Sequence, residues 1–483
     1  MSGPVKKRLS VFTLSMMTVA AVCSLRGLPM MAKEGLSMIF YILFSTIIFL
    51  IPASLVAAEL GGAFSKESGG VYTWVKAAFG SRWGFTAIWL QWIQNVVWYP
   101  TVLGFAAGAL AYLFMDPGLA KSGAYTGTVI LVAYWVATFL TLAGTDVVSK
   151  VTKYGVLFGT VLPGVLIIVL GLLWVNMGNP LEFMHVSPAI AEAEKAAGQL
   201  PHARLFPNIT GLGSVAFLAG IILLFAGVEV HAVHANELEN PGKQFPESMF
   251  LAAGVIFLLF TLGSLSVAAV LPAKDISLTA GLMQAFQMLL GKFHLEFLTP
   301  VIGLLVAFGA IGGVMSWISG PSRGLLHTAD QGELPPILAK TNKKGMQINI
   351  LMVQAIIVSL LAGLYFIMDN VSVAFFMISA MTITLYLVMY ILMYAAAIKL
   401  RYTQPDLPRT YMVPGGFYGL CAVAGIGLLG VCFALVVGFF PPTNLQVGNP
   451  ALYVGLVAGG LIVFVGLPLL INAMKKPEWK KKS

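Results

Sequence analysis

The chain alternates between long runs of apolar residues and short segments rich in polar residues. A helix that crosses the roughly 30 Å hydrocarbon core of a bilayer needs about 20 consecutive, mostly apolar residues. The apolar runs reach this length, and Gly, Pro, Asn and charged residues gather between them. We therefore predict an all-α membrane protein with twelve transmembrane helices, at about residues 10–31, 36–60, 82–114, 124–145, 152–176, 211–236, 247–271, 297–324, 348–367, 371–400, 415–439 and 450–474.

The composition indicates that lipid is the solvent of this chain. Of its 483 residues, 58% are hydrophobic and 10% are charged, whereas soluble domains are about one-quarter charged. The three cysteines lie in apolar runs and lack the spacing of a disulfide framework or a metal site. The loops hold no Walker, HExxH or CxxC motif. We therefore expect neither enzyme activity nor a metal or other cofactor.

The distribution of basic residues predicts the orientation. With the N-terminus placed in the cytoplasm, 21 of the 28 lysines and arginines fall in inner segments, six in outer segments and one, Arg26, inside the first helix. Cytoplasmic loops carry such an excess, so we predict a multi-pass protein of the cell (inner or plasma) membrane with both termini cytoplasmic. The net charge of +9 follows from this bias, and the basic tail suits anionic lipids rather than nucleic acid.

The same reading divides the chain into four parts. They are a cytoplasmic N-terminus (1–9), a ten-helix core (10–400), helices eleven and twelve (401–474) and a basic cytoplasmic tail (475–483). Membrane lipids are the expected partners of a chain this apolar. The oligomeric state stays open between a monomer and a homodimer.

Two of the predicted helices are interrupted near their middle. The first contains "VCSLRGLP", residues 22–29, and the sixth contains Gly227 followed by Glu229. Glycine weakens a helix, and proline removes an internal hydrogen bond. In lipid, backbone groups freed in this way persist only where they face protein or a water-filled cavity. Breaks at matching positions of two five-helix halves are typical of inverted-repeat transporters with a midplane site, so we predict repeats over about 10–176 and 211–400.

Four stretches carry a family resemblance: "ELGGAFSKESGGVYTW" (59–74), "GVEVHAVHANELENPG" (227–242), "SWISGPSRG" (316–324) and "RTYMVPGG" (409–416). They resemble the amino acid–polyamine–organocation superfamily, and within it the glutamate/GABA antiporter family. This resemblance covers nearly the whole chain. It implies a LeuT-type fold with a 5+5 inverted repeat and broken helices one and six, a small amino acid substrate, and exchange by alternating access.

The chain departs from that family pattern at its first helix. Many relatives carry a Gly-Ser-Gly-like loop where this chain has Val22-Cys23-Ser24, and the glutamate/GABA relatives carry a site-lining aromatic residue where it has Arg26. The resemblance therefore predicts the fold of this chain better than it predicts the substrate.

The two broken helices supply the predicted substrate site. Exposed amides at a helix terminus bind anions, and those expected to hold the substrate carboxylate belong to Cys23, Ser24 and Leu25, next to Gly27, which relaxes the backbone. The break in helix six offers carbonyl oxygens to the substrate ammonium group, from Ala226, Gly227 and Val228.

Two charged residues lie beside these breaks. Arg26 can form a bidentate pair with a carboxylate, which would suit an acidic amino acid, or it can extend toward the outer headgroups. Glu229 can pair with Arg26, line the transport path or cap the broken helix. Charges inside a membrane are costly and usually functional, so both are candidate binding residues, and Glu229 is also a candidate for gating.

Polar and aromatic residues of other helices complete the set. The candidate gate or pocket residues are Trp98, Trp317 and Tyr386, the last two supported by the resemblance. The further candidates for gating or coupling are Gln94, deep in helix three; Glu59, which suits an inner-gate network; and His231, which either titrates near physiological pH or is a buried structural histidine.

These features predict a secondary active transporter that exchanges amino acids. The resemblance favours an antiporter for an acidic or small zwitterionic amino acid, similar to glutamate or GABA. Two alternatives stay open, a proton-coupled amino acid symporter and a non-transporting membrane sensor with a transporter fold. Costly midplane charges argue against the sensor, since a sensor has no need of them.

Overall fold

The computed structural model describes residues 9–64, 67, 70–185, 192, 195–196, 203–207, 209, 211–232, 238–368, 370–442, 447 and 449–480. Within these ranges the protein is helical and has no β-strand. Its α-helices are α1 Val11–Val22, α2 Leu28–Ala32, α3 Ser37–Ser45, α4 Ile51–Ala63, α5 Val71–Phe79, α6 Ser81–Leu113, α7 Gly123–Leu142, α8 Thr145–Val156, α9 Leu162–Asn176, α11 Ala216–Phe225, α12 Glu229–Ala232, α13 Pro241–Val270, α14 Gly281–Lys292, α15 Thr299–Asp330, α16 Ile348–Ile367, α17 Val371–Thr403, α18 Gly416–Val437 and α19 Pro450–Ala473.

Ten helices of the described chain are long and apolar enough to cross a membrane. They correspond to ten of the twelve predicted spans. Two of them are joined across π-helical segments: Thr46–Leu50 links α3 to α4, and Leu157–Val161 links α8 to α9. The fifth predicted span begins earlier than expected, at Thr145, because the amphipathic α8 continues directly into it.

The two remaining predicted spans, the first and the sixth, are the interrupted ones. After α1 the chain is extended at Cys23 and Ser24, makes a 3₁₀ turn over Leu25–Gly27, and then continues as α2. After α11 it is extended at Ala226 and takes up a φ of 110° at Gly227 before α12 begins. Both predicted breaks are therefore present. The twelve crossings and the 5+5 repeat stay predictions.

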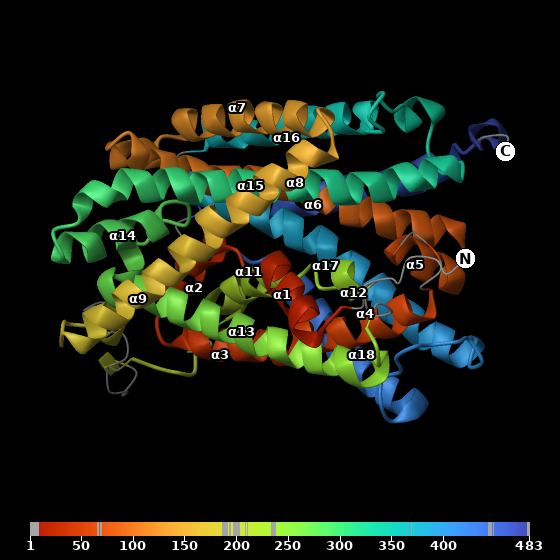
Figure 1. Ribbon diagram of the computed structural model, residues 1–483, viewed down its shortest axis with the longest axis horizontal. Helices are drawn as coiled ribbons and strands as arrows, with labels where there is room; N and C mark the ends of the chain where they lie inside the picture. Colours follow the sequence, from red (N-terminus) through yellow and green to blue (C-terminus); the bar gives the residue numbers. More distant parts are fainter. Residues whose placement is uncertain are drawn as a thin grey trace, which may run out of the picture.

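The buried centre of the molecule is formed by α6 and α17. In their most apolar stretches, 83% of the residues of α6 and 89% of those of α17 are buried, against 11% in the peripheral α19. α6 packs against both α15 and α17. Figure 1 shows α7 and α16 along one side of this centre, and α3, α13 and α18 along the opposite side. The interrupted α1 and α11 lie between these layers.

The two ends of the helical bundle carry different connections. α14, in a segment expected outside, lies at one end, and α5, in a segment expected inside, lies at the other (Figure 1). This separation agrees with the predicted alternation of the loops. Which end faces the cytoplasm stays a prediction.

One close helix crossing shapes the central cavity. Gly159 in the π-helical segment lies directly against Gly309 of α15, and a Cβ atom on either residue would collide with the backbone of the other. Only glycine allows this approach. Both residues line the cavity described next, so the crossing forms part of its wall.

Candidate functional site

A cavity of about 350 Å³ lies where the two interrupted helices meet α6, α9, α13 and α15. It is mostly apolar, with a few polar side chains, as small-molecule sites usually are. The predicted site residues that line it are Cys23, Ser24, Leu25, Arg26, Gln94, Trp98, Ala226, Trp317 and Tyr386. Those placed outside its lining are Gly27, Glu59, Gly227, Val228 and Glu229. The side chain of His231 falls outside the described part of the structure.

The first break exposes less backbone than its sequence suggests. The N–H of Cys23 still donates to the carbonyl of Val19, at 2.8 Å. Farther along, the N–H of Gly27 donates to the carbonyl of Ser24, at 3.1 Å, and closes the 3₁₀ turn. The amides of Ser24 and Leu25 are therefore the better candidates for an incoming carboxylate.

The second break depends on Gly227. Its φ of 110° belongs to the region that favours glycine, and a Cβ atom there would lie 3.1 Å from the ring of Trp317. The N–H of Gly227 donates to the hydroxyl of Tyr390, at 3.0 Å. This contact fixes the break against α17.

Glu229 is bound by neutral donors. The residue is 1% exposed, and its Oε1 accepts from Gln91 Nε2 at 3.0 Å and from the Tyr386 hydroxyl at 2.5 Å. The hydroxyl of Tyr390 donates to the other oxygen. Among the described contacts Glu229 does not pair with Arg26, one of the three arrangements considered from the sequence. The carboxylate instead joins the second break to α6 and α17.

Arg26 is buried and points into the protein interior. It is 4% exposed, and its Nη1 donates to Thr101 Oγ1 at 3.0 Å. The centre of the guanidinium group lies 5.6 Å from the ring of Trp98 and 5.5 Å from that of Phe375. Its Nε is buried without an acceptor, and no carboxylate of the described chain forms an ion pair with it. The guanidinium group is thus enclosed by protein side chains.

Two amides of α6 border the same cavity. Gln94 and Asn95 both donate to the carbonyl of Gln91, at 3.1 and 2.8 Å, and both line the cavity. Each contact uses one of the two N–H donors of the amide, so each side chain still has an N–H and an oxygen to offer to a ligand. Asn95 is not among the site residues predicted from the sequence, so its place in the cavity lining is a finding of the structure.

Trp98 and Trp317 meet across the cavity. Their ring centroids are 6.2 Å apart and their planes are inclined by 71°, an edge-to-face contact. The pair joins α6 to α15. Its position is compatible with the gate or pocket role considered for both residues.

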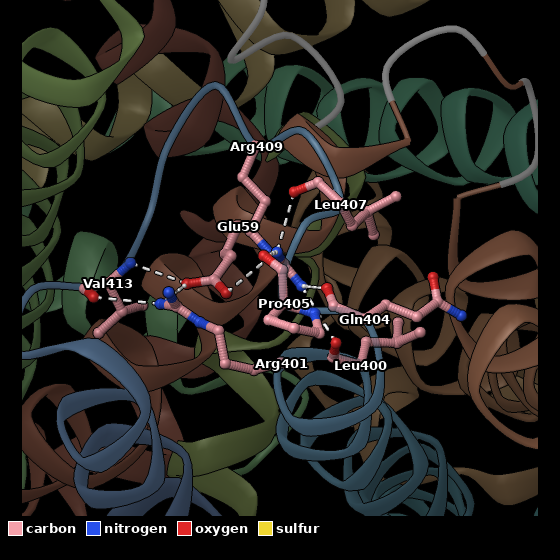
Figure 2. A network of polar contacts seen from close by, with 8 residues as sticks. All are labelled: Glu59, Leu400, Arg401, Gln404, Pro405, Leu407, Arg409 and Val413. Carbon is pink, nitrogen blue, oxygen red and sulfur yellow. Dashed lines mark hydrogen bonds and ion pairs between the residues drawn. The ribbon is translucent and has the colours of Figure 1, made fainter.

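Glu59 belongs to a separate cluster at the end of α4 (Figure 2). One carboxylate oxygen accepts from Arg401, at 2.8 Å, and from the N–H of Val413, at 2.8 Å. The other lies 3.4 Å from Nε of Arg409. Figure 2 shows the two arginines on either side of the carboxylate. The cluster therefore ties α4 to the end of α17 and to the loop that leads into α18.

Arg409 anchors that loop by several further contacts. Its guanidinium donates to the carbonyls of Leu400, Gln404, Pro405 and Leu407. Burial lowers the pKa of Arg409, while the charge of Glu59 opposes that change and Arg401 adds to it. Neither arginine was identified as a partner of Glu59 from the sequence.

The comparisons with known proteins agree with this architecture. The family model described as "Amino acid permease" matches residues 9–465. The chain is 39% identical to an uncharacterized transporter of Legionella pneumophila over 465 residues, 96% of each chain. It is 34% identical over 469 residues to a glutamate/gamma-aminobutyrate antiporter of Lactococcus lactis, covering 96% of this chain and 90% of that protein. It is also 24% identical over 472 residues to a probable agmatine/putrescine antiporter of Lactococcus lactis, covering 97% and 96%.

Proposed function

Because the chain belongs to the amino acid permease family of membrane transporters, we propose that it exchanges amino acids across the cell membrane by alternating access. Its substrate would be an acidic or small zwitterionic amino acid, similar to glutamate or GABA. One observation supports this proposal above the others. Arg26 lines the cavity at the two helix breaks, its side chain is buried, and no described carboxylate forms an ion pair with it.

The proposed substrate pose follows from the polar groups around the cavity. The α-carboxylate meets the amides of Ser24 and Leu25, which lie at a helix terminus. The α-ammonium group meets the carbonyl oxygen of Ala226 and the side-chain oxygens of Gln94 and Asn95. Gly227 and Val228 shape the break behind Ala226. Glu229 holds that break against α6 and α17.

Arg26 has a separate role in this proposal. A second carboxylate on the substrate would face the guanidinium group, which a low-dielectric site makes attractive to anions. Lysine, arginine and polyamines would be repelled by the same charge. The agmatine/putrescine relative is a match of lower identity than the glutamate/gamma-aminobutyrate relative, which is compatible with this preference.

Transport is tested with purified protein in liposomes. With unlabelled glutamate or GABA inside, we expect the entry of external labelled glutamate to saturate and to depend on the internal amino acid. Uptake driven by an imposed proton gradient into empty liposomes would favour the symporter instead. Absence of any uptake of glutamate, GABA, glutamine or arginine would contradict a transport function.

The proposed topology has twelve crossings, with two inverted repeats and both termini in the cytoplasm. It places Lys343 inside and Lys292 outside. An impermeant thiol reagent added to intact cells should label a cysteine at position 292 and spare one at position 343, in a background without the native cysteines. Labelling at position 343 from outside would contradict the topology.

A further inference from the structure

Three neutral side chains contact the guanidinium group of Arg26 and form its socket, and Tyr365 is a further neighbour. Trp98 and Thr101 come from α6, and Phe375 comes from α17. Thr101 is fully buried, and its own hydroxyl donates to the carbonyl of Trp98, at 2.7 Å. Because a hydroxyl has a single proton, Thr101 can meet Arg26 only as an acceptor. The Thr101 hydroxyl is therefore oriented by its own helix before it receives the arginine.

The two aromatic rings hold the cation without neutralising it. Cations are attracted to the faces of aromatic rings within about 6 Å of the centroid, and Trp98 and Phe375 both lie within that range. Neither ring carries an opposite charge, so the rings leave the positive charge of Arg26, a residue that lines the cavity, without neutralisation. A carboxylate in place of Trp98 or Phe375 would instead have formed an ion pair with the guanidinium group.

Phe375 differs clearly from its neighbour on the same helix. Phe376 packs edge-on against Phe217 and stacks with Tyr453, whereas Phe375 lies against the guanidinium group of Arg26. Both phenylalanines are buried. Burial and residue type alone would not distinguish them, but their partners do.

We propose that Thr101 and Phe375 are positioning residues that turn the guanidinium group of Arg26 toward the cavity and thereby set its preference for anionic ligands. The proposal rests on the proposed function for the identity of the physiological anion, a substrate carboxylate. The orientation of the charge itself can be measured without any substrate.

Cys23 provides that measurement, because its thiol group lies three residues from Arg26 and lines the same cavity. In full-length protein with Cys421 and Cys432 replaced by serine, its reaction rate is measured with an anionic methanethiosulfonate (sulfonatoethyl) and with a cationic one (trimethylammonium-ethyl). A guanidinium group facing the cavity accelerates the anionic reagent relative to the cationic one. The ratio of the two rates reports the field at Cys23 and cancels general changes of access.

We expect Thr101→Val and Phe375→Leu to lower this rate ratio by about fivefold or more, since local fields change encounter rates by factors of 10 or greater. Thr101→Ser and Phe375→Tyr restore an acceptor and a ring, so they should keep the wild-type ratio. The matched controls are Phe376→Leu and Thr138→Val, because Thr138 is equally buried but bonds the carbonyl of Tyr134 in its own helix. In these control variants the ratio of the two reaction rates should stay within about twofold of the wild-type ratio.

An unchanged ratio in Thr101→Val and Phe375→Leu would overturn the positioning role, and so would an equal fall in the two controls. Counterflow assays on the same variants separate this outcome from the proposed function. If the socket variants lower the rate ratio and also weaken competition by glutamate more than by GABA, both proposals are supported. If the rate ratio falls as expected but wild-type protein exchanges no amino acid, the socket stands and the proposed function fails.

Discussion

Glu59 and Arg26 are both buried charges, yet their surroundings are opposite. Glu59 is 2% exposed and has two guanidinium groups and a backbone N–H around it. Arg26 is 4% exposed, and its described contacts are with one hydroxyl and two aromatic rings, with Tyr365 as a further neighbour. The charge of Glu59 is already balanced by its protein partners, so this cluster serves to hold structural elements together. A buried charge without an opposite partner is costly, and at a cavity wall its missing partner can be a ligand.

Glu229 lies between these two extremes. Its carboxylate accepts from Gln91, Tyr386 and Tyr390, but none of these donors carries a charge. These hydrogen bonds satisfy its oxygens, and none of the ion pairs in the described part of the chain involves Glu229. Glu59, Arg26 and Glu229 are all buried, and they differ in whether an opposite charge pairs with them. Single substitutions can test each of the three sites separately.

The largest effect on stability is expected at Glu59. Glu59→Gln keeps the size of the side chain but leaves Arg401 and Arg409 without their counter-charge, so it should cost about 3–5 kcal/mol of unfolding free energy. Thermal unfolding in detergent measures this loss. Glu247→Gln, at an exposed position on α13, is the control and should unfold like wild type. A wild-type melting temperature for Glu59→Gln would remove the structural role of the cluster.

A smaller loss of stability is expected at Glu229, together with a large loss of transport. Glu229→Ala removes the acceptor of three neighbouring donors, but Tyr386 lies within hydrogen-bond reach of both Tyr390 and Gln91. We therefore expect one net unsatisfied group, at a cost of about 1–3 kcal/mol, and a looser break against α17. We expect folded protein with at least tenfold slower counterflow, a change of about 1.4 kcal/mol or more. Glu229→Gln keeps the shape of the side chain and one acceptor oxygen, so it should be more stable than Glu229→Ala. Normal counterflow in Glu229→Ala would separate this residue from the transport cycle.

The smallest loss of unfolding free energy is expected at Glu333, a buried acid whose basic partner is partly exposed to solvent. Glu333 is 2% exposed, and Lys475 bridges to it at 2.9 Å, but the lysine side chain is 35% exposed. Ser81 and Asn472 also donate to Glu333. Lys475→Met should therefore cost no more than about 1 kcal/mol, and less at high salt. If Lys475→Met lowered the unfolding free energy as much as Glu59→Gln, the type of pairing would not explain the difference in stability between these sites.

Sequence patterns predict the helices and the breaks because both depend on local chemistry. Long apolar runs define the spans, and glycine, proline and internal charges mark the interruptions at Gly27 and Gly227. The partners of the buried charges were missed because they are distant in sequence. Thr101 lies 75 residues from Arg26, and Arg401 lies 342 residues from Glu59. In an apolar helix, a threonine or a phenylalanine such as Phe375 has the same sequence signature as a packing residue.

The central claim is that the charge of Arg26, which no described carboxylate pairs, serves the ligand. It is tested by ligand competition in wild type and Arg26→Met. Methionine fills much of the arginine volume and removes the charge. Competition with labelled substrate is measured for glutamate, GABA, glutamine and arginine in proteoliposomes. We expect glutamate to weaken by about 5- to 150-fold, equivalent to roughly 1–3 kcal/mol, while GABA changes by no more than about twofold. An equal loss of all four ligands, or arginine as the strongest competitor of the wild type, would contradict the account.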